Sequence, residues 1–339
     1  MSQEILQKTL QKKLLDIQNL TITFNTKNGP LIAVRDLSFQ IKMGETLGVV
    51  GESGCGKSIT NLAIMGLLPP QAIVSATRLS LEGKDLLTLG ERDWQQIRGQ
   101  DIAMIFQDPM SALNPCYTVG AQLVETLRVH RDMSRRDALL ESLNLMEQVG
   151  IPAPSERLKA YPHELSGGMA QRVMIAMAIS SNPKLLIADE PTTALDVTIQ
   201  DQILRLLKDI QEKRQMSLML VTHDLGVVAQ NTDRIQVMYA GELVEAGLTQ
   251  DVIHHSTHPY TAGLLAGHPE ARSGSGDGMK ARLPSIPGMV PNLRQRPQGC
   301  QFHPRCAWAQ KQDETRCRFE APHLNGKVRC HFPLQKRDS

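Results

Sequence analysis

The most specific chemical pattern in the sequence is a glycine-rich segment that reads Gly51-Glu52-Ser53-Gly54-Cys55-Gly56-Lys57-Ser58. It fits the pattern G-x-x-x-x-G-K-[ST], follows an apolar run at residues 46–50 and opens a helical pattern. In such a loop, backbone N–H groups surround phosphates, the lysine reaches the outer phosphates and the hydroxyl binds Mg²⁺. The sequence therefore predicts a phosphate-binding loop. The residues expected to bind ATP here are Gly51, Ser53, Gly54, Cys55, Gly56, Lys57, Ser58 and Ile59.

Two adjacent carboxylates, Asp189 and Glu190, end the apolar run of residues 185–188. Ligands of open α/β sheets bind beyond the carboxyl ends of the strands. We expect Asp189 to hold Mg²⁺, directly or through water, and Glu190 to orient and deprotonate the attacking water. An Asp-Glu pair at a strand end is common and by itself indicates little. The phosphate loop upstream is what makes a catalytic role for this pair a specific prediction.

A second glycine pair lies in the segment Leu165-Ser166-Gly167-Gly168-Met169-Ala170-Gln171-Arg172. Ser166 can cap the helical pattern that follows, and the glycine amides stay available to an anion. An ordinary helix cap would explain these features alone. Leu-Ser-Gly-Gly with a downstream Gln-Arg nevertheless resembles the signature of ABC-type ATPases, and the resemblance covers residues 14–247. Met169 and Ala170 stand where this signature often has polar residues.

The resemblance gives four further residues an expected role. Gln107 resembles the Q-loop glutamine, and Asp196 ends a segment, Ala194-Leu195-Asp196, that resembles the D-loop. His223 resembles the switch histidine that contacts the γ-phosphate, and Phe24 lies where the family stacks an aromatic ring on adenine. The resemblance thus assigns catalysis to Glu190, His223 and Gln107, and Mg²⁺ binding to Ser58, Gln107 and Asp189.

In this family, two ATPase subunits face each other head to tail. Each ATP then lies between the phosphate loop of one subunit and the signature of the other. The resemblance implies that this chain offers its signature to the partner's nucleotide, through Ser166, Gly167, Gly168 and Gln171. ATP binding closes such a dimer, hydrolysis reopens it, and the Q-loop region passes the motion to membrane-spanning subunits.

Apolar runs of strand length alternate with helical patterns, which predicts an α/β sheet. The expected strands lie at residues 14–24, 46–50, 102–106, 185–188, 218–221 and 235–239. Residues 109–181 interrupt this alternation, because helical spacing recurs there without a strand. Together with the resemblance, this predicts an ABC-type nucleotide-binding domain over residues 14–247: a RecA-like phosphate-loop core with a β subdomain and a helical insertion.

The composition changes after Gly247 toward His, Pro, Gly and Ser, including a Gly/Ser stretch at residues 273–278, and predicts a separate extension over residues 248–339. Three segments there resemble the tail of ATP-binding subunits of dipeptide, oligopeptide and nickel importers: His258-Pro259-Tyr260-Thr261, residues 283–288, and Cys300 with Pro304-Arg305-Cys306. The resemblance is strongest to the dipeptide group. It implies a second, different ATPase subunit, two permease subunits, an extracytoplasmic peptide-binding protein and a location at the cytoplasmic face of the inner membrane.

Four cysteines, Cys300, Cys306, Cys317 and Cys330, gather near the end of the chain. In a reducing compartment such a cluster indicates a metal site before it indicates disulfides. The spacing lacks the C-x₂₋₄-C element of common zinc sites and also lacks ferredoxin spacing, so it does not identify the metal. The importer resemblance favours a [4Fe-4S] cluster over Zn²⁺, and either over free thiols.

Cys55 lies inside the phosphate loop, where a helix N-terminus can lower the pKa of a thiol. We expect bound nucleotide to slow its alkylation. A small residue tolerated at this position is the simpler interpretation.

Composition excludes several classes of protein. A formal net charge of +2 and 4% aromatic residues argue against a nucleic-acid platform. No stretch approaches the roughly 20 apolar residues of a membrane-spanning helix, and the N-terminus lacks the apolar core of a secretory signal, so a cytosolic location is expected.

Two alternative functions remain beside the transport ATPase. A DNA-maintenance ATPase would need long heptad repeats between Lys57 and Ser166, which are absent; a metal- or redox-sensing ATPase would use the cysteines.

Overall fold

The structure is a computed structural model that describes residues 12–193, 195–267 and 285–335. The chain separates into two compact units. The first unit contains residues 41–45 and 88–221 and the start of the chain to Leu14. The second unit contains residues 15–40, 46–87 and 222 to the C-terminal end.

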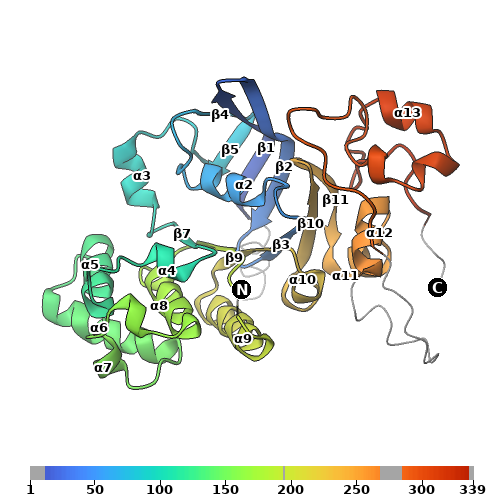
Figure 1. Cartoon of the computed structure of the whole chain (residues 1–339). Helices are drawn as coiled ribbons and strands as arrows, with labels where there is room; N and C mark the ends of the chain where they lie inside the picture. Colours follow the sequence, from blue (N-terminus) through green and yellow to red (C-terminus); the bar gives the residue numbers. More distant parts are fainter. Residues whose placement is uncertain (1–11, 194, 268–284, 336–339) are drawn as a thin grey trace, which may run out of the picture. The chain divides into compact units, whose positions relative to one another are not determined.

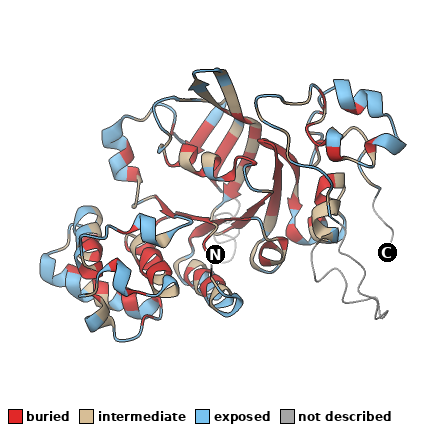
Figure 2. Cartoon of the chain, in the orientation of Figure 1, coloured by how far each residue is buried: buried red, intermediate tan, exposed pale blue. Residues whose placement is uncertain are grey.

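Three parallel strands form the centre of the first unit: β7 (Ile102–Ile105), β8 (Leu185–Asp189) and β9 (Ser217–Thr222). Every residue of these strands is buried, as Figure 2 shows. Continuous apolar runs are typical of parallel strands that are covered on both faces. The strands predicted at residues 102–106, 185–188 and 218–221 are therefore confirmed, with bounds that differ by one residue.

Helices make up the rest of the first unit (Figure 1). Residues 109–181, all of which the structure describes, contain no strand, which confirms the predicted helical insertion. Side-chain oxygens of Thr118, Ser134 and Ser166 accept hydrogen bonds from backbone N–H groups in the first turns of three of these helices, as N-caps do. The helices of the unit are α3 (Glu91–Ile97), α4 (Pro109–Ala112), α5 (Val119–Arg131), α6 (Arg135–Gln148), α7 (Pro154–Arg157), α8 (Gly167–Ile179) and α9 (Val197–Arg214), with a 3₁₀ turn at Pro162–Glu164.

The second unit begins with a mostly antiparallel sheet in the order β2-β1-β5-β6, with β4 paired to β1. Only β1 was expected, as residues 14–24. The others alternate buried and exposed side chains or are very short, and such segments give weak apolar signals. The bounds are β1 (Lys13–Thr26), β2 (Gly29–Lys42), β4 (Ala72–Ser75), β5 (Arg78–Leu81) and β6 (Lys84–Asp85).

A second group of strands in this unit carries the phosphate loop. Strand β3 (Thr46–Val50) runs parallel to β10 (Arg234–Tyr239), which turns back into β11 (Glu242–Leu248). This confirms the strands predicted at residues 46–50 and 235–239. Four helices complete the group: α2 (Lys57–Ile64), α10 (Leu225–Asn231), α11 (Thr249–His254) and α12 (Pro259–Ala266).

The residues after Gly247, called the C-terminal segment from here on, contribute side chains to the core of the second unit. Tyr260 and Phe302 are buried in one cluster with Val50, Val237 and Tyr239, which belong to the strands around the phosphate loop. No break in packing therefore marks residue 248, and the domain boundary there stays a prediction. Over residues 285–335, which the structure describes, the segment contains one short helix, α13 (Glu314–Phe319), and 3₁₀ turns at His303–Arg305 and Ala309–Lys311.

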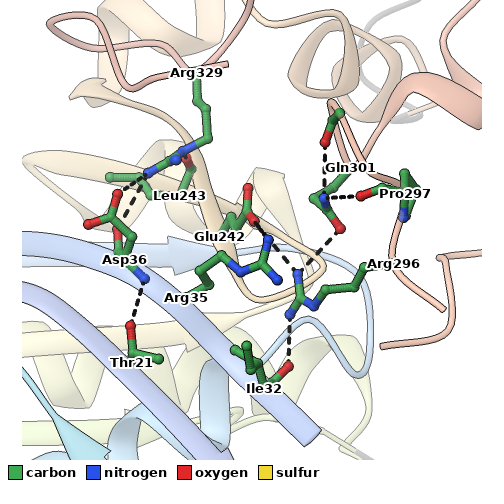
Figure 3. Close-up of polar contacts among 11 residues, drawn as sticks. Thr21, Ile32, Arg35, Asp36, Glu242, Leu243, Arg296, Pro297, Gln301 and Arg329 are labelled. Carbon is green, nitrogen blue, oxygen red and sulfur yellow. Dashed lines mark hydrogen bonds and ion pairs between the residues drawn. The ribbon is translucent and has the colours of Figure 1, made fainter. Parts of the chain in front are cut away.

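Buried arginines fasten this segment to the strands (Figure 3). Arg296 donates to the Ile32 carbonyl at 2.9 Å and lies 3.7 Å from the Glu242 carboxylate. Arg329 donates to the Leu243 carbonyl at 3.0 Å and to the Asp36 carboxylate at 3.2 Å. Burial raises the pKa of Glu242, although the arginines around it act in the opposite direction.

Some sequence predictions concern residues outside the described part of the chain: Ala194 of the expected D-loop, the Gly/Ser stretch 273–278, and Leu283 and Pro284 of the importer-like tail. Among the described residues, no helix has the length and apolar character needed to cross a membrane.

The turn between β10 and β11 offers a stability test. Ala240 and Gly241 both have positive φ, of 47° and 80°, as do Glu82 and Gly83 in the β5–β6 turn, of 49° and 85°. A Cβ at Gly241 would lie 2.2 Å from the Ala33 carbonyl oxygen, whereas one at Gly83 would meet nothing within 4 Å. Gly241→Ala should therefore cost about 3 kcal/mol through strain and overpacking, and Gly83→Ala about 1 kcal/mol through strain alone.

Thermal unfolding of the two variants beside the wild type measures this difference. Equal shifts of the unfolding midpoint in Gly241→Ala and Gly83→Ala would contradict the close approach at Ala33.

Candidate nucleotide-binding site

The phosphate loop of the second unit curls around its own lysine. Lys57 begins helix α2 with a side chain that is only 5% exposed. Its Nζ donates to the Gly51 carbonyl at 2.7 Å and to the Glu52 carbonyl at 3.3 Å. These bonds hold the ammonium inside the loop, which is where a phosphate-binding lysine has to stand.

Glycine is required at two points of this loop by space and by conformation. A Cβ at Gly51 would lie 2.2 Å from the Met238 carbonyl oxygen and 2.6 Å from the Cys55 Sγ. Gly56 precedes α2 with a φ of 99° and has no side chain to cap the helix. No side-chain cap therefore covers the first turn of α2, as at helix N-termini that bind anions.

The remaining predicted loop residues differ in exposure. Ser53, Gly54 and Ser58 are exposed and Ile59 is half-buried. Phe24 is half-buried near the end of β1, where it pairs with Ala72 of β4. The three exposed residues and the half-buried Phe24 therefore keep surface that a ligand can contact.

Cys55 is buried inside the phosphate loop. Its side chain is 1% exposed, and burial raises the pKa of the thiol, with the nearby Lys57 ammonium acting in the opposite direction to a smaller extent. A helix N-terminus can lower the pKa of a thiol, but at Cys55 burial disfavours the thiolate more than the positive neighbour favours it. The expected slowing of its alkylation by bound nucleotide stays a prediction. The simpler interpretation, a small residue packed under the loop, fits this geometry.

The carboxylate pair lies at the end of β8 in the first unit. Asp189 is the last residue of that strand and is 4% exposed. Glu190 follows with a φ of 48°, an uncommon conformation for a residue with a side chain, and its N–H donates to the Val221 carbonyl at 2.8 Å. The turn away from the strand leaves the Glu190 carboxylate half-buried rather than enclosed.

Two side chains fix the Glu190 carboxylate. Gln107 Nε2 donates to Glu190 Oε2 at 3.1 Å, and Thr193 Oγ1 donates to the same oxygen at 2.9 Å. The structure thus brings Gln107 and Glu190 together, although 83 residues separate them in sequence. Sequence reasoning missed Thr193; its place three residues after Glu190, in a turn, was the available signal.

The signature residues lie at the start of α8. Ser166 Oγ accepts a hydrogen bond from the Met169 N–H at 3.3 Å, and both Ser166 and Gly167 are exposed. Gly168 is half-buried, and a Cβ there would lie 3.1 Å from Ile199. Gln171 departs from expectation, because its side chain is 2% exposed. It follows the inward face of α8 and is not open to a partner's nucleotide.

Two further predicted residues flank helices. Asp196 is exposed and caps α9 by accepting a hydrogen bond from the Ile199 N–H at 3.0 Å. His223 is exposed directly after β9, in the second unit, and precedes Asp224, which caps α10. Both residues end a strand or loop where a side chain can reach a ligand.

The four C-terminal cysteines converge without forming a metal-binding group. Cys300, Cys306, Cys317 and Cys330 line one cavity of about 10 Å³, together with the fully buried His258. Burial raises the pKa of Cys300 to about 12 and of Cys330 to about 11, which favours neutral thiols. In the part of the chain that the structure describes, no three His, Cys, Asp or Glu side chains are arranged to hold a metal ion. As placed, these residues do not fit the expected cluster.

The different burial of Cys55 and Cys116 can be measured by alkylation. Cys116 is exposed, so a maleimide at pH 7.5 should label Cys55 at least about 10-fold more slowly than Cys116. Because the pKa of Cys55 is raised, its labelling should accelerate as the pH rises toward that pKa. Peptide mass spectrometry at timed intervals gives both rates, and the urea-unfolded chain is the control in which the two cysteines should react alike. Equal rates in the folded protein would contradict the burial.

Comparison with known proteins agrees with this geometry. Residues 34–193 match the family described as ABC transporter, and residues 244–312 match the family described as oligopeptide/dipeptide transporter, C-terminal region. The chain is 50% identical over 328 residues to the dipeptide transport ATP-binding protein DppD of Haemophilus influenzae, covering 96% of this chain and 97% of that protein. It is 50% identical over 302 residues to the oligopeptide transport ATP-binding protein OppD of Bacillus subtilis, covering 89% and 83%.

A solved structure has the same fold. The dimeric structure of an ATP-binding cassette in a post-hydrolysis state, bound to ADP and phosphate, aligns with a TM-score of 0.61 at 27% identity, over 70% of this chain and 99% of that one. The fold is thus that of an ABC ATPase nucleotide-binding domain. With the identity to DppD and OppD and the C-terminal match, the chain belongs to the ATP-binding proteins of the dipeptide and oligopeptide branch of ABC transporters.

Proposed function

We propose that the chain hydrolyses ATP to power import of di- or oligopeptides, or of a related small solute, through a heteromeric ABC transporter. Membership of the family makes the chain an ATPase that uses ATP and Mg²⁺. The observation that carries the proposal is the Glu190 carboxylate, which Gln107 and Thr193 hold at the end of β8. A carboxylate fixed in this way can orient water and accept its proton.

In this proposal the residues take the roles that the family resemblance implies. Backbone N–H groups of the phosphate loop and the Lys57 ammonium bind the phosphates, and Phe24 contacts adenine. Ser58, Asp189 and Gln107 bind Mg²⁺ or its water. Glu190 is the general base, and His223 contacts the γ-phosphate. The buried lysine and the exposed Ser58 at the start of α2 support this assignment for the phosphates.

The signature serves a partner's nucleotide in this proposal. The exposure of Ser166 and Gly167 and the helix start beside Gly168 support it. Asp196 faces the partner from the D-loop. Gln171 is left out of this surface because it is buried. The partners are a second homologous ATPase subunit, two permease subunits that hold the complex at the cytoplasmic face of the inner membrane, and, through them, an extracytoplasmic peptide-binding protein; the C-terminal family match supports this assembly.

The two alternative functions gain no support. The relatives at 50% identity are transport proteins by name, and the identity spans 96% of this chain in one of them. A DNA-maintenance ATPase or a metal- or redox-sensing ATPase would have to use this whole sequence for another purpose.

The general base is tested by Glu190→Gln, which keeps the size and one hydrogen-bond acceptor but removes the proton-accepting charge. ATP hydrolysis should fall by roughly 10² to 10⁴, with ATP binding retained, because that is the usual contribution of a general base. Steady-state phosphate release and ATP titration measure the two properties. Glu212→Gln, at an exposed position of α9, is the matched control and should hydrolyse ATP normally.

Lys57→Ala separates binding from chemistry in the same assays. It should weaken ATP binding itself, since it removes the ammonium that the loop encloses. Full turnover in Glu190→Gln would overturn the role of Glu190, and unchanged ATP binding in Lys57→Ala would overturn the phosphate-loop assignment.

The [4Fe-4S] cluster on the four C-terminal cysteines, with Zn²⁺ as the alternative, stays a prediction. In its favour, all four thiols line one cavity. Against it, the described side chains are not placed as metal ligands, so the thiols would have to move toward a common centre on binding. A cluster would neutralise gathered thiolates and would tie together residues 285–335, which have little regular secondary structure.

Metal analysis of anaerobically purified full-length protein tests this prediction. About four iron and four sulfide per chain, with brown colour, are expected, and Cys317→Ser should lose them while Cys116→Ser keeps them. Colourless protein with about one zinc per chain would contradict the iron assignment. Protein free of both metals would contradict a metal site.

A further inference from the structure

The phosphate loop is held from outside by the C-terminal segment, and the contact is made at Glu52. Within the second unit, Arg305 donates from Nη1 to Glu52 Oε2 at 2.6 Å and from Nη2 to Glu52 Oε1 at 3.0 Å. The two bonds run side by side between a planar guanidinium and a carboxylate, the geometry of a strong ion pair. Residues 253 positions apart in sequence are thereby joined.

Arg305 is built into its surroundings, because its other donors are also bonded. Nε donates to the Pro287 carbonyl at 2.9 Å, and Nη1 also lies 3.3 Å from the Tyr239 hydroxyl. The side chain is 5% exposed, and the guanidinium stands 5.8 Å from the centre of the Tyr239 ring. The bond to Glu52 raises the pKa of Arg305 further, so the group stays charged. A surface arginine that happens to meet a carboxylate would not have this enclosure.

Tyr260 holds the same loop residue by its backbone. The Glu52 N–H donates to the Tyr260 hydroxyl at 3.0 Å. Tyr260 is fully buried and packs against Tyr239 and Phe302, with ring centres 4.6 and 5.3 Å away. The ring is therefore rigidly placed, and its oxygen is a fixed acceptor for the loop.

All three polar groups of Glu52 are consequently bonded. Tyr260 accepts from its N–H, Arg305 donates to its carboxylate, and its carbonyl accepts from Lys57 Nζ at 3.3 Å. Glu52 therefore links the C-terminal segment directly to the Lys57 ammonium, which is assigned to the phosphates.

The charge of Glu52 explains why its contact with Arg305 matters for nucleotide binding. A phosphate-binding loop should not carry an uncompensated carboxylate, since a negative charge beside a triphosphate weakens binding. The Arg305 guanidinium neutralises Glu52 at contact distance. Removing Arg305 would leave a half-buried carboxylate unpaired and free to turn toward the phosphates or toward Lys57.

We propose that Arg305 and Tyr260 are positioning residues of the nucleotide site: from the C-terminal segment they fix and neutralise Glu52, and so keep the phosphate loop in its ATP-binding conformation. The inference rests on the proposed phosphate-binding role of residues 51–58. The C-terminal segment would thus affect ATP affinity through its contacts with a single loop residue, Glu52.

Arg329 supplies the matched comparison. It is also a buried arginine of the C-terminal segment, and it also bonds a carboxylate, Asp36, and a backbone carbonyl, Leu243 (Figure 3). Its partners belong to β2 and β11 and not to the loop. If the C-terminal segment affected ATP binding only by stabilising the fold, loss of Arg329 and loss of Arg305 would have similar effects on ATP affinity.

The experiment compares ATP affinity in full-length Arg305→Met, Arg305→Lys, Glu52→Gln, the Glu52→Gln/Arg305→Met double variant and Arg329→Met. Arg305→Met should raise the Kd for ATP at least about 10-fold, because the binding-competent loop becomes a minor population. Lysine keeps the charge without the two-pronged geometry, so Arg305→Lys should raise the Kd less, by about 3-fold. Arg329→Met should lower the unfolding midpoint and leave the Kd within about 2-fold of the wild type.

The double variant provides the decisive readout. Glutamine leaves no charge to compensate, so Glu52→Gln/Arg305→Met should bind ATP within about 3-fold of Glu52→Gln alone, a partial rescue of Arg305→Met. In the assembled transporter the loss should appear in KM, with kcat within about 3-fold, since the reacting groups are untouched. A purely structural role for Arg305 predicts neither the rescue nor the KM effect.

Several results would overturn the inference. They are wild-type Kd values in Arg305→Met, effects of Glu52→Gln and Arg305→Met that simply multiply, or an equal rise of Kd in Arg329→Met. If Arg305→Met fails to fold, Arg305→Lys still tests the inference, because a wild-type Kd in that variant would overturn it. Lys57→Ala is measured beside them: if it binds ATP normally the proposed nucleotide site fails, whereas a loss there with a normal Arg305→Met defeats only the present inference.

Discussion

A buried ammonium organises the nucleotide-binding half of this protein. The Lys57 side chain is almost fully enclosed, and a buried charge needs polar partners at short range. The loop supplies them with the carbonyls of Gly51 and Glu52, which forces it to close on its own lysine. That closure brings Gly51 against the Met238 carbonyl, where only glycine fits, and covers Cys55. The glycine, the lysine and the buried thiol of the loop are thus consequences of one electrostatic requirement.

The described part of the C-terminal segment, most of which beyond residue 284 lies outside helices and strands, shows how such a chain is held to a domain. It contributes Tyr260 and Phe302 to the core around β10, and it fastens its edges with arginines that reach carbonyls and carboxylates of the strands. Arginine suits this task because its planar donor group can satisfy several acceptors at once. One of these arginines, Arg305, ends on the phosphate loop rather than on a strand. Attachment of the segment and the shape of the nucleotide site therefore share a contact.

Sequence patterns predicted the elements that local physics dictates. The parallel strands were found because they are continuous apolar runs, and the insertion because residues 109–181 keep helical spacing. The strands β2, β4, β5 and β6 were missed, since their side chains alternate or the strands are short. Strand β11 was missed because two glutamates and a glycine interrupt its apolar residues. Burial was not predictable for two motif residues: it raises the pKa of the Cys55 thiol, and it leaves Gln171 only 2% exposed. A motif predicts the local backbone turn and the residue types in it, but it does not predict which distant residues pack over each side chain. Thr193 beside Glu190 was missed for the same reason.

The sequence by itself determined which chemistry this protein carries, because the loop Gly51–Ser58, the strand-end pair Asp189 and Glu190, and the signature at Ser166 are each encoded within a few neighbouring residues. Only the tertiary structure decided what holds those groups in place. The pairing of Gln107 with Glu190 and the grip of Arg305 and Tyr260 on Glu52 join residues that are 83, 253 and 208 positions apart. Such contacts depend on how distant strands and turns pack, and no local period or spacing in one sequence carries that information.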